Sequence, residues 1–168
     1  MFVLSKIYSR NFMIEIKAPQ PYHLDRPSVF LAGSIEMGKA VDWQQAVVEK
    51  LQETNLIILN PRRETWDESW HQTITDPEFR EQVEWELDAL TAADFILFNF
   101  IPDTLSPISL LELGLFKDKQ LFVCCPDGYW RKGNIEVVCK RFGIPLFNKM
   151  EDAMEAFLSE LGKSTTKT

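Results

Sequence analysis

Apolar residues along this chain follow two patterns that alternate from one end to the other. Short continuous apolar runs cover residues 28–33, 56–59, 95–98 and 121–125, and each ends at or just before Gly, Asn or Pro. Such runs are typical of strands that are buried on both faces of a sheet. Residues 145–147 predict a further short strand, and the alternating segment 12–17 predicts a separate one near the N-terminus.

Between these runs, apolar residues recur at the three- and four-residue spacing of helices. The predicted helices span about residues 43–51, 76–90, 108–116, 134–142 and 154–162. Asp76 is a good N-cap with Pro77 at the first helical position, and Gly162 is the expected C-cap of the last helix. This alternation predicts an α/β fold: a flavodoxin-like or Rossmann-like, doubly wound, mainly parallel five-stranded sheet with helices on both faces.

The chain has 168 residues, the length of one domain. We assign residues 28–162 to that domain, residues 1–27 to an N-terminal extension with one strand, and residues 163–168 to a disordered tail. In doubly wound sheets, ligands bind beyond the carboxyl ends of the strands, near the point where the strand order reverses. The loops that follow the predicted strands are therefore the places to look for functional residues.

The charge balance narrows the choice of partners. The formal net charge is -7 and the isoelectric point is about 4.9. A protein that neutralises many phosphates carries the opposite balance, so a nucleic acid polymer is not an expected partner. A small anionic ligand is compatible with the sequence, because one Arg and a few backbone N–H groups can hold a single phosphate.

The cysteines, histidines and apolar segments exclude further classes of protein. The cysteines are Cys124, Cys125 and Cys139, which we interpret as buried reduced thiols, and with only two histidines a zinc site has few ligands to use. We expect no metal and no cofactor. No apolar run reaches the roughly 18 residues of a membrane span, and residues 1–12 lack the apolar core of a signal peptide. We therefore expect a cytoplasmic protein with no membrane partner.

Glu112 is the residue that most strongly indicates chemistry. It lies in a helix that is apolar on nearly every side, in the segment Ser106-Pro-Ile-Ser-Leu-Leu-Glu-Leu-Gly114. A carboxylate in such a setting must be paired, lose its charge or face a cavity, because burying it unpaired is costly. The alternative interpretation is a carboxylate that is ion-paired for structural reasons.

Several loop residues at the same predicted edge could contact a ligand. Gly33 and Ser34 follow the first buried strand, in a loop that lacks the ending of a P-loop. Asn60 and Arg62 follow the second strand and lead into a loop that contains Trp66 and Asp67, where aromatic rings could stack on a base. The alternatives are a tight structural turn at Gly33 and a surface loop anchored by its tryptophans.

Three segments together resemble the nucleoside 2-deoxyribosyltransferase family and its relatives, the 2′-deoxynucleoside 5′-monophosphate N-glycosidases. They are Phe30-Leu-Ala-Gly-Ser-Ile35, Glu86-Leu-Asp-Ala-Leu-Thr-Ala-Ala-Asp94 and the segment 106–114. The resemblance implies that Glu112 is the nucleophile and that Glu86 protonates the departing base. On helical pattern alone, Glu86 would more often be a merely solvated carboxylate.

The resemblance also assigns roles to binding residues. Ser106 matches a position that is Asp in the transferases and Ser in the monophosphate hydrolases, and Asn134 matches an Asn that contacts the substrate of a neighbouring subunit. Two departures stand out. Glu86 replaces an Asp, and Glu36 stands where the hydrolases carry a basic residue, which argues against a bound 5′-phosphate.

The resemblance therefore implies an enzyme that cleaves the N-glycosidic bond of a nucleoside or nucleotide through a covalent intermediate on Glu112. A free base would be the second small-molecule partner, and a homodimer or higher homo-oligomer is expected. The apolar face of the last helix is one candidate interface, and ordinary core packing is the alternative. Two other functions stay open: hydrolysis of a nucleoside 5′-monophosphate or another N-glycoside, and a non-catalytic nucleotide-binding sensor.

Overall fold

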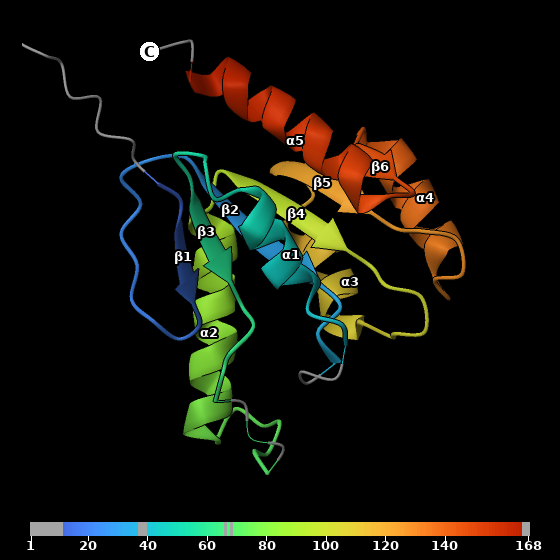
Figure 1. The fold of residues 1–168 in the computed structure, drawn as a ribbon. Coiled ribbons are helices and arrows are strands. Elements are labelled where there is room, and N and C mark those ends of the chain that lie inside the picture. The colour runs from blue at the N-terminus through green and yellow to red at the C-terminus, as the bar shows by residue number, and fades with distance from the viewer. Residues whose placement is uncertain (1–11, 37–39, 66, 68, 166–168) are drawn as a thin grey trace, which may run out of the picture.

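One parallel six-stranded sheet forms the centre of the molecule. The computed structural model describes residues 12–36, 40–65, 67 and 69–165. The strand order is β1-β3-β2-β4-β5-β6, and every pair of neighbours is parallel (Figure 1). The strands are β1 (Ile14–Lys17), β2 (Ser28–Gly33), β3 (Ile57–Asn60), β4 (Phe95–Asn99), β5 (Gln120–Cys124) and β6 (Leu146–Phe147).

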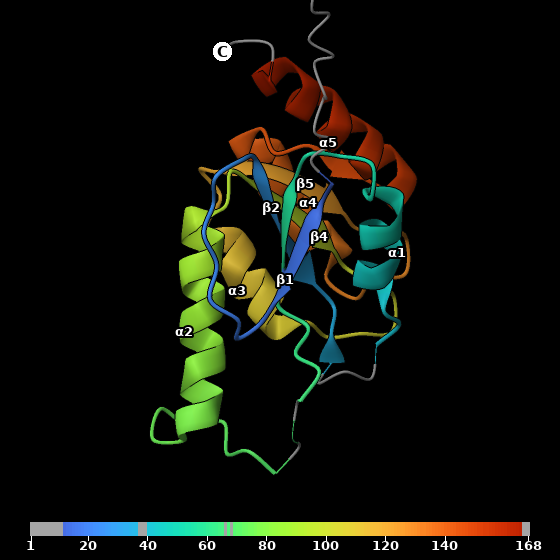
Figure 2. The same cartoon turned by 60° about the vertical axis from the view of Figure 1, so that its left-hand side comes forward.

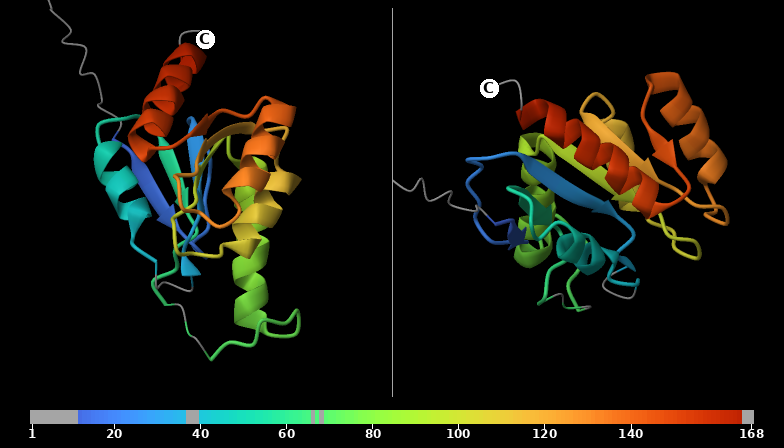
Figure 3. Two further views of the ribbon diagram at one scale, coloured as in Figure 1. Left: turned by 90° about the vertical axis from the view of Figure 1, so that its right-hand side faces the viewer. Right: turned by 45° about the horizontal axis from the view of Figure 1, so that its top comes forward.

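The helices cover both faces of this sheet, so the predicted doubly wound α/β fold is confirmed. One core lies between the sheet and α2, α3 and α4, and a second lies between the sheet and α1 and α5 (Figures 2 and 3). The four central strands β2, β3, β4 and β5 have side chains in both cores, which explains their continuous apolar sequences. The helices are α1 (Trp43–Lys50), α2 (Pro77–Ala92), α3 (Pro107–Leu115), α4 (Lys132–Phe142) and α5 (Met150–Thr165).

The sheet has one strand more than the five that we predicted for the domain. The strand of the N-terminal extension joins the same sheet as β1, in register with β3 from Ile14 opposite Ile57 to Lys17 opposite Asn60. Without β1, the backbone N–H and C=O groups along one side of β3 would have no strand partner, and β1 supplies it.

Two predictions about the C-terminus require correction. Helix α5 continues to Thr165, so Gly162 is not its C-cap, and residues 163–165 are helical rather than a disordered tail. Gly162 does not have the positive φ that a glycine C-cap adopts, so the helix runs through it. Residues 166–168 of the predicted tail lie outside the described residues.

The apolar face of α5 belongs to the core. Its side chains Ala153, Met154, Phe157 and Leu161 pack against the sheet, which supports the core-packing interpretation of this helix. None of the described helices is both long enough and apolar enough to span a membrane.

The topology brings the carboxyl ends of β2, β3 and β4 together. Strand β2 pairs with β3 on one side and with β4 on the other, so the strand order reverses there. Gly33 ends β2 with φ +140°, and a Cβ at this position would lie 2.2 Å from the carbonyl oxygen of Asn99 in β4. Only glycine permits this close approach, which joins the ends of the two strands that flank the switch point.

Candidate active site

Helix α3 carries Glu112 into the interior on the side of the sheet that α2 covers. The side chain is only 6% exposed. Burial, with a smaller contribution from the negative charge of Glu86, raises the pKa of Glu112 to about 8. Within the described part of the chain, we find no hydrogen bond to its carboxyl oxygens. This carboxylate is therefore buried without the partner that a structural ion pair would provide.

Helix α2 supplies the second carboxylate, Glu86, which is half-buried. Burial raises its pKa to about 7, and a hydrogen bond from Gln82 Nε2 to Glu86 Oε1 (2.8 Å) acts in the opposite direction. Part of the Glu86 side chain is exposed to solvent. Its carboxyl group is nevertheless densely surrounded by protein atoms, and this desolvation raises the pKa. Burial therefore raises the pKa values of both carboxyl groups toward neutral pH, and the charge of Glu86 adds to the rise at Glu112.

A cluster of three hydroxyl groups lies between the end of β2 and the start of α3. Ser34 Oγ is 2.6 Å from Thr104 Oγ1 and 2.7 Å from Ser106 Oγ. The backbone N–H of Ile101 also donates to Ser34 Oγ (3.0 Å). Ser34 is completely buried and Ser106 nearly so, so both predicted binding residues belong to one internal network.

The N-terminus of α3 holds a carboxylate from another part of the chain. Glu36 Oε1 accepts hydrogen bonds from the backbone N–H groups of Leu105 (2.8 Å) and Ser106 (2.9 Å). Ser106 has a left-handed conformation with φ 45°, and its own side chain does not cap the helix. Glu36 therefore occupies the position where the N-terminus of α3 would attract an anion.

Gly33 connects the same loop to α3. Its carbonyl oxygen accepts a hydrogen bond from Ser109 Oγ (2.9 Å), one turn before Glu112. The space beside its Cα is filled by the backbone of Asn99, as described above. The structure thus gives Gly33 a structural reason to be glycine, and its contact with a ligand stays a prediction.

Asn60 and Arg62 make internal contacts at the end of β3. Asn60 Nδ2 donates to Glu15 Oε1 (2.7 Å), and Asn60 Oδ1 accepts from the backbone N–H of Arg62 (3.0 Å). The Arg62 guanidinium donates to the carbonyl oxygen of Ala40 (2.8 Å) and lies 3.4 Å from a carboxylate oxygen of Asp42. These contacts tie β3 to β1 and to the start of α1, so both residues organise the edge of the site.

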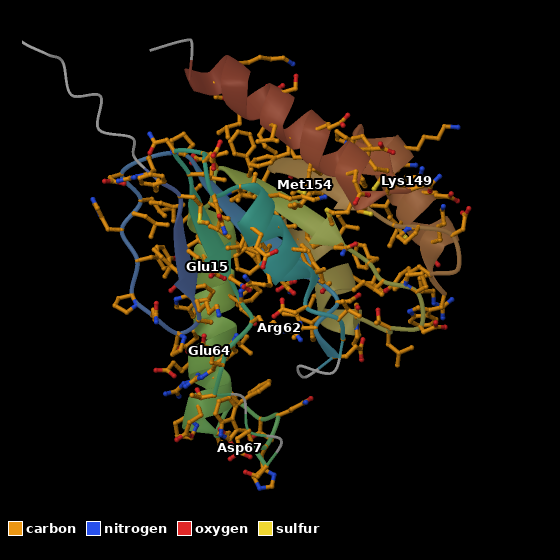
Figure 4. The ribbon with its side chains drawn as sticks, viewed as in Figure 1. Glu15, Arg62, Glu64, Asp67, Lys149 and Met154 are labelled. Atoms are coloured by element: carbon orange, nitrogen blue, oxygen red, sulfur yellow. The ribbon has the colours of Figure 1, made fainter. Side chains whose placement is uncertain are left out.

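The loop after Arg62 extends away from the two catalytic candidates. Figure 4 places Arg62 near the ends of β3 and α1, and Asp67 at the outer end of the loop. Asp67 is exposed and accepts a hydrogen bond from the backbone N–H of Ser69 (2.8 Å). The Arg63 guanidinium lies over the Trp70 ring, with its Cζ atom 4.8 Å from the centroid of the ring. Trp66 lies outside the described residues.

Asn134 lies on a different surface. It is exposed on α4 and lines a groove against α3. Leu110, Leu113 and Gly114 form the α3 side of this groove, and on a helix with 3.6 residues per turn none of them shares the face of Glu112. The structure therefore does not bring Asn134 together with Glu112 and Glu86 in one chain, and its role at a neighbouring subunit stays a prediction.

Two buried glutamines escaped the sequence analysis. Gln44 on α1 and Gln82 on α2 are 0% and 3% exposed, and each has one amide atom without a hydrogen-bond partner in the structure as described: Nε2 of Gln44 and Oε1 of Gln82. The spacing of Gln82 is one possible signal, since it precedes Glu86 by one helical turn and shares its face. Glutamine is usually a surface residue of helices, so this spacing does not by itself predict a functional residue.

Comparison with known families connects this geometry to a chemistry. The sequence profile of the family described as "nucleoside 2-deoxyribosyltransferase like" matches residues 26–129. The chain belongs to this family. The matched range of this nucleoside 2-deoxyribosyltransferase-like chain contains both Glu86 and Glu112, whereas Asn134 lies beyond it. No curated protein matches the sequence.

Family membership supports an enzyme of the glycosyl-transfer type that acts on small-molecule nucleosides. In the nucleoside 2-deoxyribosyltransferase-like chain, the half-buried Glu86 and the buried Glu112 lie on the helices that follow β3 and β4. A search of the described residues finds no group of three or more His, Cys, Asp or Glu that could hold a metal ion. The carboxyl groups of Glu86 and Glu112 are suited to nucleophilic and acid–base chemistry.

Proposed function

We propose that this protein cleaves the N-glycosidic bond of a nucleoside by double displacement, with Glu112 as the nucleophile and Glu86 as the acid and base. The observation that carries this proposal is the buried Glu112 carboxylate, which has no hydrogen-bond donor within the described chain. The negative charge of Glu86 contributes to its raised pKa. Burying such a group costs stability. An enzyme that attacks an electron-poor carbon benefits, because a poorly solvated carboxylate is a more reactive nucleophile.

In the first step, a Glu112 carboxylate oxygen forms a bond to C1′ of the sugar while the bond from C1′ to the base nitrogen breaks. The electron pair of that bond moves onto the base, and the proton of Glu86 neutralises it. The transition state has positive charge on the sugar, which the negative Glu112 stabilises. The product is a sugar esterified to Glu112 and a free neutral base.

In the second step, an acceptor attacks C1′ from the face that the base left, and the ester bond to Glu112 breaks. If the acceptor is a second base, Glu86 takes its N–H proton and the outcome is transfer. If it is water, Glu86 takes the water proton and the outcome is hydrolysis. Two displacements give net retention of configuration at C1′.

In the free protein the pKa of Glu112, about 8, lies above that of Glu86, about 7, so a single proton favours Glu112 and a bound substrate has to shift it to Glu86. Catalysis requires the proton on Glu86 and a negative charge on Glu112. The singly protonated pair is most populated between the two pKa values. A base nitrogen placed next to Glu86 accepts a hydrogen bond from its protonated form and so favours the reactive arrangement.

Glu36 favours a nucleoside without a 5′-phosphate. Its carboxylate already accepts hydrogen bonds from two backbone N–H groups at the start of α3, six residues before Glu112. Six residues of helix span about 9 Å, a distance that the sugar and its 5′ substituent can bridge. A phosphate placed there would lose these donors to Glu36 and meet its negative charge.

A monophosphate hydrolase is therefore the second candidate within the same chemistry. The buried hydroxyl groups of Ser34 and Ser106 favour it, since hydroxyl groups can donate to phosphate oxygens, but they already contact one another. A nucleotide-binding sensor without turnover is the candidate from another class. A binding role alone does not explain why the Glu112 carboxylate is buried without a partner.

A homodimer or larger homo-oligomer remains our expectation from the family resemblance. Helix α3 exposes three apolar side chains on the outer side of the site: Ile108, Leu111 and Leu115 are 59%, 58% and 60% exposed. These positions recur at helical spacing and form one stripe that a second copy could cover. Asn134 would then act across that interface.

Product analysis tests the proposal. Purified protein is incubated with nucleosides and their 5′-monophosphates, with and without a free acceptor base, and the products are separated by chromatography. New nucleoside that forms only with the acceptor indicates a transferase, and free base without acceptor indicates a hydrolase. If wild-type protein releases no base from any compound, the catalytic proposal fails for this panel and the sensor gains support.

A further inference from the structure

Gln82 lies next to the proposed acid in an unusual state for a buried amide. Its Nε2 donates two hydrogen bonds, to the carbonyl oxygen of Pro61 (2.8 Å) and to Glu86 Oε1 (2.8 Å). Its Oε1 is buried and accepts from no group in the part of the chain that the structure describes. A buried acceptor left without a donor is destabilising, so most native structures avoid it unless function requires it.

The hydrogen bond to Pro61 fixes which way the amide faces. If the amide were turned over, its oxygen would face the Pro61 carbonyl oxygen, which can only accept, and the hydrogen bond to Pro61 would be lost. The oxygen must therefore point away from the Pro61 carbonyl. Hydrogen bonds to Pro61, which follows β3, and to Glu86, one turn further along α2, hold the amide of Gln82 in place. Its free acceptor therefore has a defined position relative to the carboxyl group of Glu86.

The position of Gln82 along α2 places it toward the carboxyl ends of the strands. Helix α2 begins beyond the carboxyl ends of the strands and runs back along the sheet (Figure 2). Gln82 is one turn closer to that beginning than Glu86, and Pro61 directly follows β3. It thus borders the edge of the sheet where ligands of this fold class bind.

We propose that Gln82 is a specificity-determining residue that recognises the leaving base through an exocyclic amino group. This inference rests on the proposed function. Gln82 Oε1 and the protonated Glu86 present an acceptor beside a donor. The matching edge of a base has an N–H donor beside a ring nitrogen acceptor.

This edge identifies a class of substrate. The amino group of adenine lies beside a ring nitrogen that can be protonated as the base departs, and the amino group of cytosine lies beside another. Hypoxanthine and uracil carry a carbonyl oxygen in place of the amino group. That oxygen would face Gln82 Oε1, which leaves both acceptors unsatisfied. Discrimination of this kind amounts to about ten- to hundredfold.

The test compares kcat/KM for 2′-deoxyadenosine and 2′-deoxyinosine, which differ in the group at C6 and in the proton on the neighbouring N1. We expect wild-type protein to prefer 2′-deoxyadenosine by about tenfold or more, and Gln82→Met to reduce the ratio to about one. Methionine keeps the length and volume of the side chain without its acceptor. Gln44→Met is the matched control: it removes the other buried glutamine with an unpartnered amide atom, which lies on α1 and contacts the Arg62 guanidinium (3.4 Å) rather than Glu86, and it should leave the ratio unchanged.

Binding of the free bases separates this inference from the proposed reaction. Calorimetry with adenine and hypoxanthine needs no turnover. Tighter binding of adenine to wild-type protein, lost in Gln82→Met and kept in Gln44→Met, supports the inference even if neither nucleoside is cleaved. Equal binding of the two bases, tighter binding of hypoxanthine, or a preference for adenine that Gln82→Met retains would overturn it.

Discussion

Helix α3 holds two carboxylates in opposite states, one at its N-terminus and one in its second half. At its N-terminus, Glu36 accepts two backbone hydrogen bonds and completes the helix. Two turns later, Glu112 is buried with no described donor and a pKa raised to about 8. The same functional group thus accepts hydrogen bonds from backbone donors in one place and from no donor of the described chain in the other. The comparison shows that the surroundings, rather than the residue type, determine which glutamate is available for chemistry.

The largest expected effect distinguishes these two glutamates directly. Glu112→Gln removes the proposed nucleophile but keeps the shape of the side chain, so kcat should fall by about 10³-fold or more. Glu36→Gln, the matched change at the N-terminus of the helix, should leave cleavage of a nucleoside within about tenfold of wild type. Steady-state rates with one nucleoside measure both. Comparable losses in the two variants would remove the distinction.

Glu86→Gln should have the next largest effect. Loss of a general acid typically reduces the rate by about 10²- to 10⁴-fold. The loss should be smaller for a nucleoside whose base leaves without protonation, because such a base needs no acid. Rates measured across a series of bases of different basicity test this expectation. A loss that is the same for every base would assign Glu86 a structural role.

Glu36→Ala should change the choice of substrate. It frees the N–H groups of Leu105 and Ser106, so the ratio of kcat/KM for a 5′-monophosphate to that for the nucleoside should rise by about tenfold. Glu36→Gln removes the charge but keeps an acceptor, and should give a smaller rise. Wild-type protein that already prefers the monophosphate would contradict our view of Glu36.

The smallest expected effect concerns stability and pH. Because the pKa of Glu112 is raised from 4.5 to about 8 in the folded protein, the folded state favours the protonated form. The stability that this provides is complete below about pH 4.5 and is lost as pH rises through about 8. Glu112→Gln cannot titrate, so its advantage over wild type should grow from pH 5 to pH 9.

Thermal unfolding at several pH values measures that difference. For a protein of this size, each kcal/mol shifts Tm by about 2 to 4 °C. The same scan on Glu36→Gln is the control, and its difference from wild type should not grow with pH in this way. A constant difference between Glu112→Gln and wild type from pH 5 to pH 9 would mean that Glu112 is not desolvated.

The fold was largely predictable because its strands are buried on both faces. Continuous apolar runs and helical spacing specify an α/β sheet, and the segment motifs pointed to Glu86 and Glu112. The edge strand β1 was harder to place in the sheet. It pairs with β3 through backbone hydrogen bonds, and the side-chain pattern of the sequence does not show which strand is its partner. The end of α5 was misplaced because Gly162 can act either as a helix stop or as an ordinary helical residue.

The environment of the site was less predictable than its residues. Neither the hydrogen bonds of Glu36 at α3 nor the free acceptor of Gln82 follows from spacing along the chain, since each depends on contacts between segments far apart in sequence. Asn60 and Arg62 were selected as ligand contacts from their position after a strand. Their side chains join β1, β3 and the start of α1, contacts that spacing along the chain does not reveal, and their contact with a ligand stays a prediction.

The most direct test of the central claim is detection of the sugar on Glu112. Wild-type protein is mixed with a nucleoside in the absence of an acceptor base, quenched in acid during turnover, digested and mapped by mass spectrometry. We predict a peptide heavier by one sugar residue, with the modification on Glu112, and no such peptide from Glu112→Gln. Cleavage of the nucleoside with no adduct on wild-type protein, or with the sugar on another residue, would contradict the account.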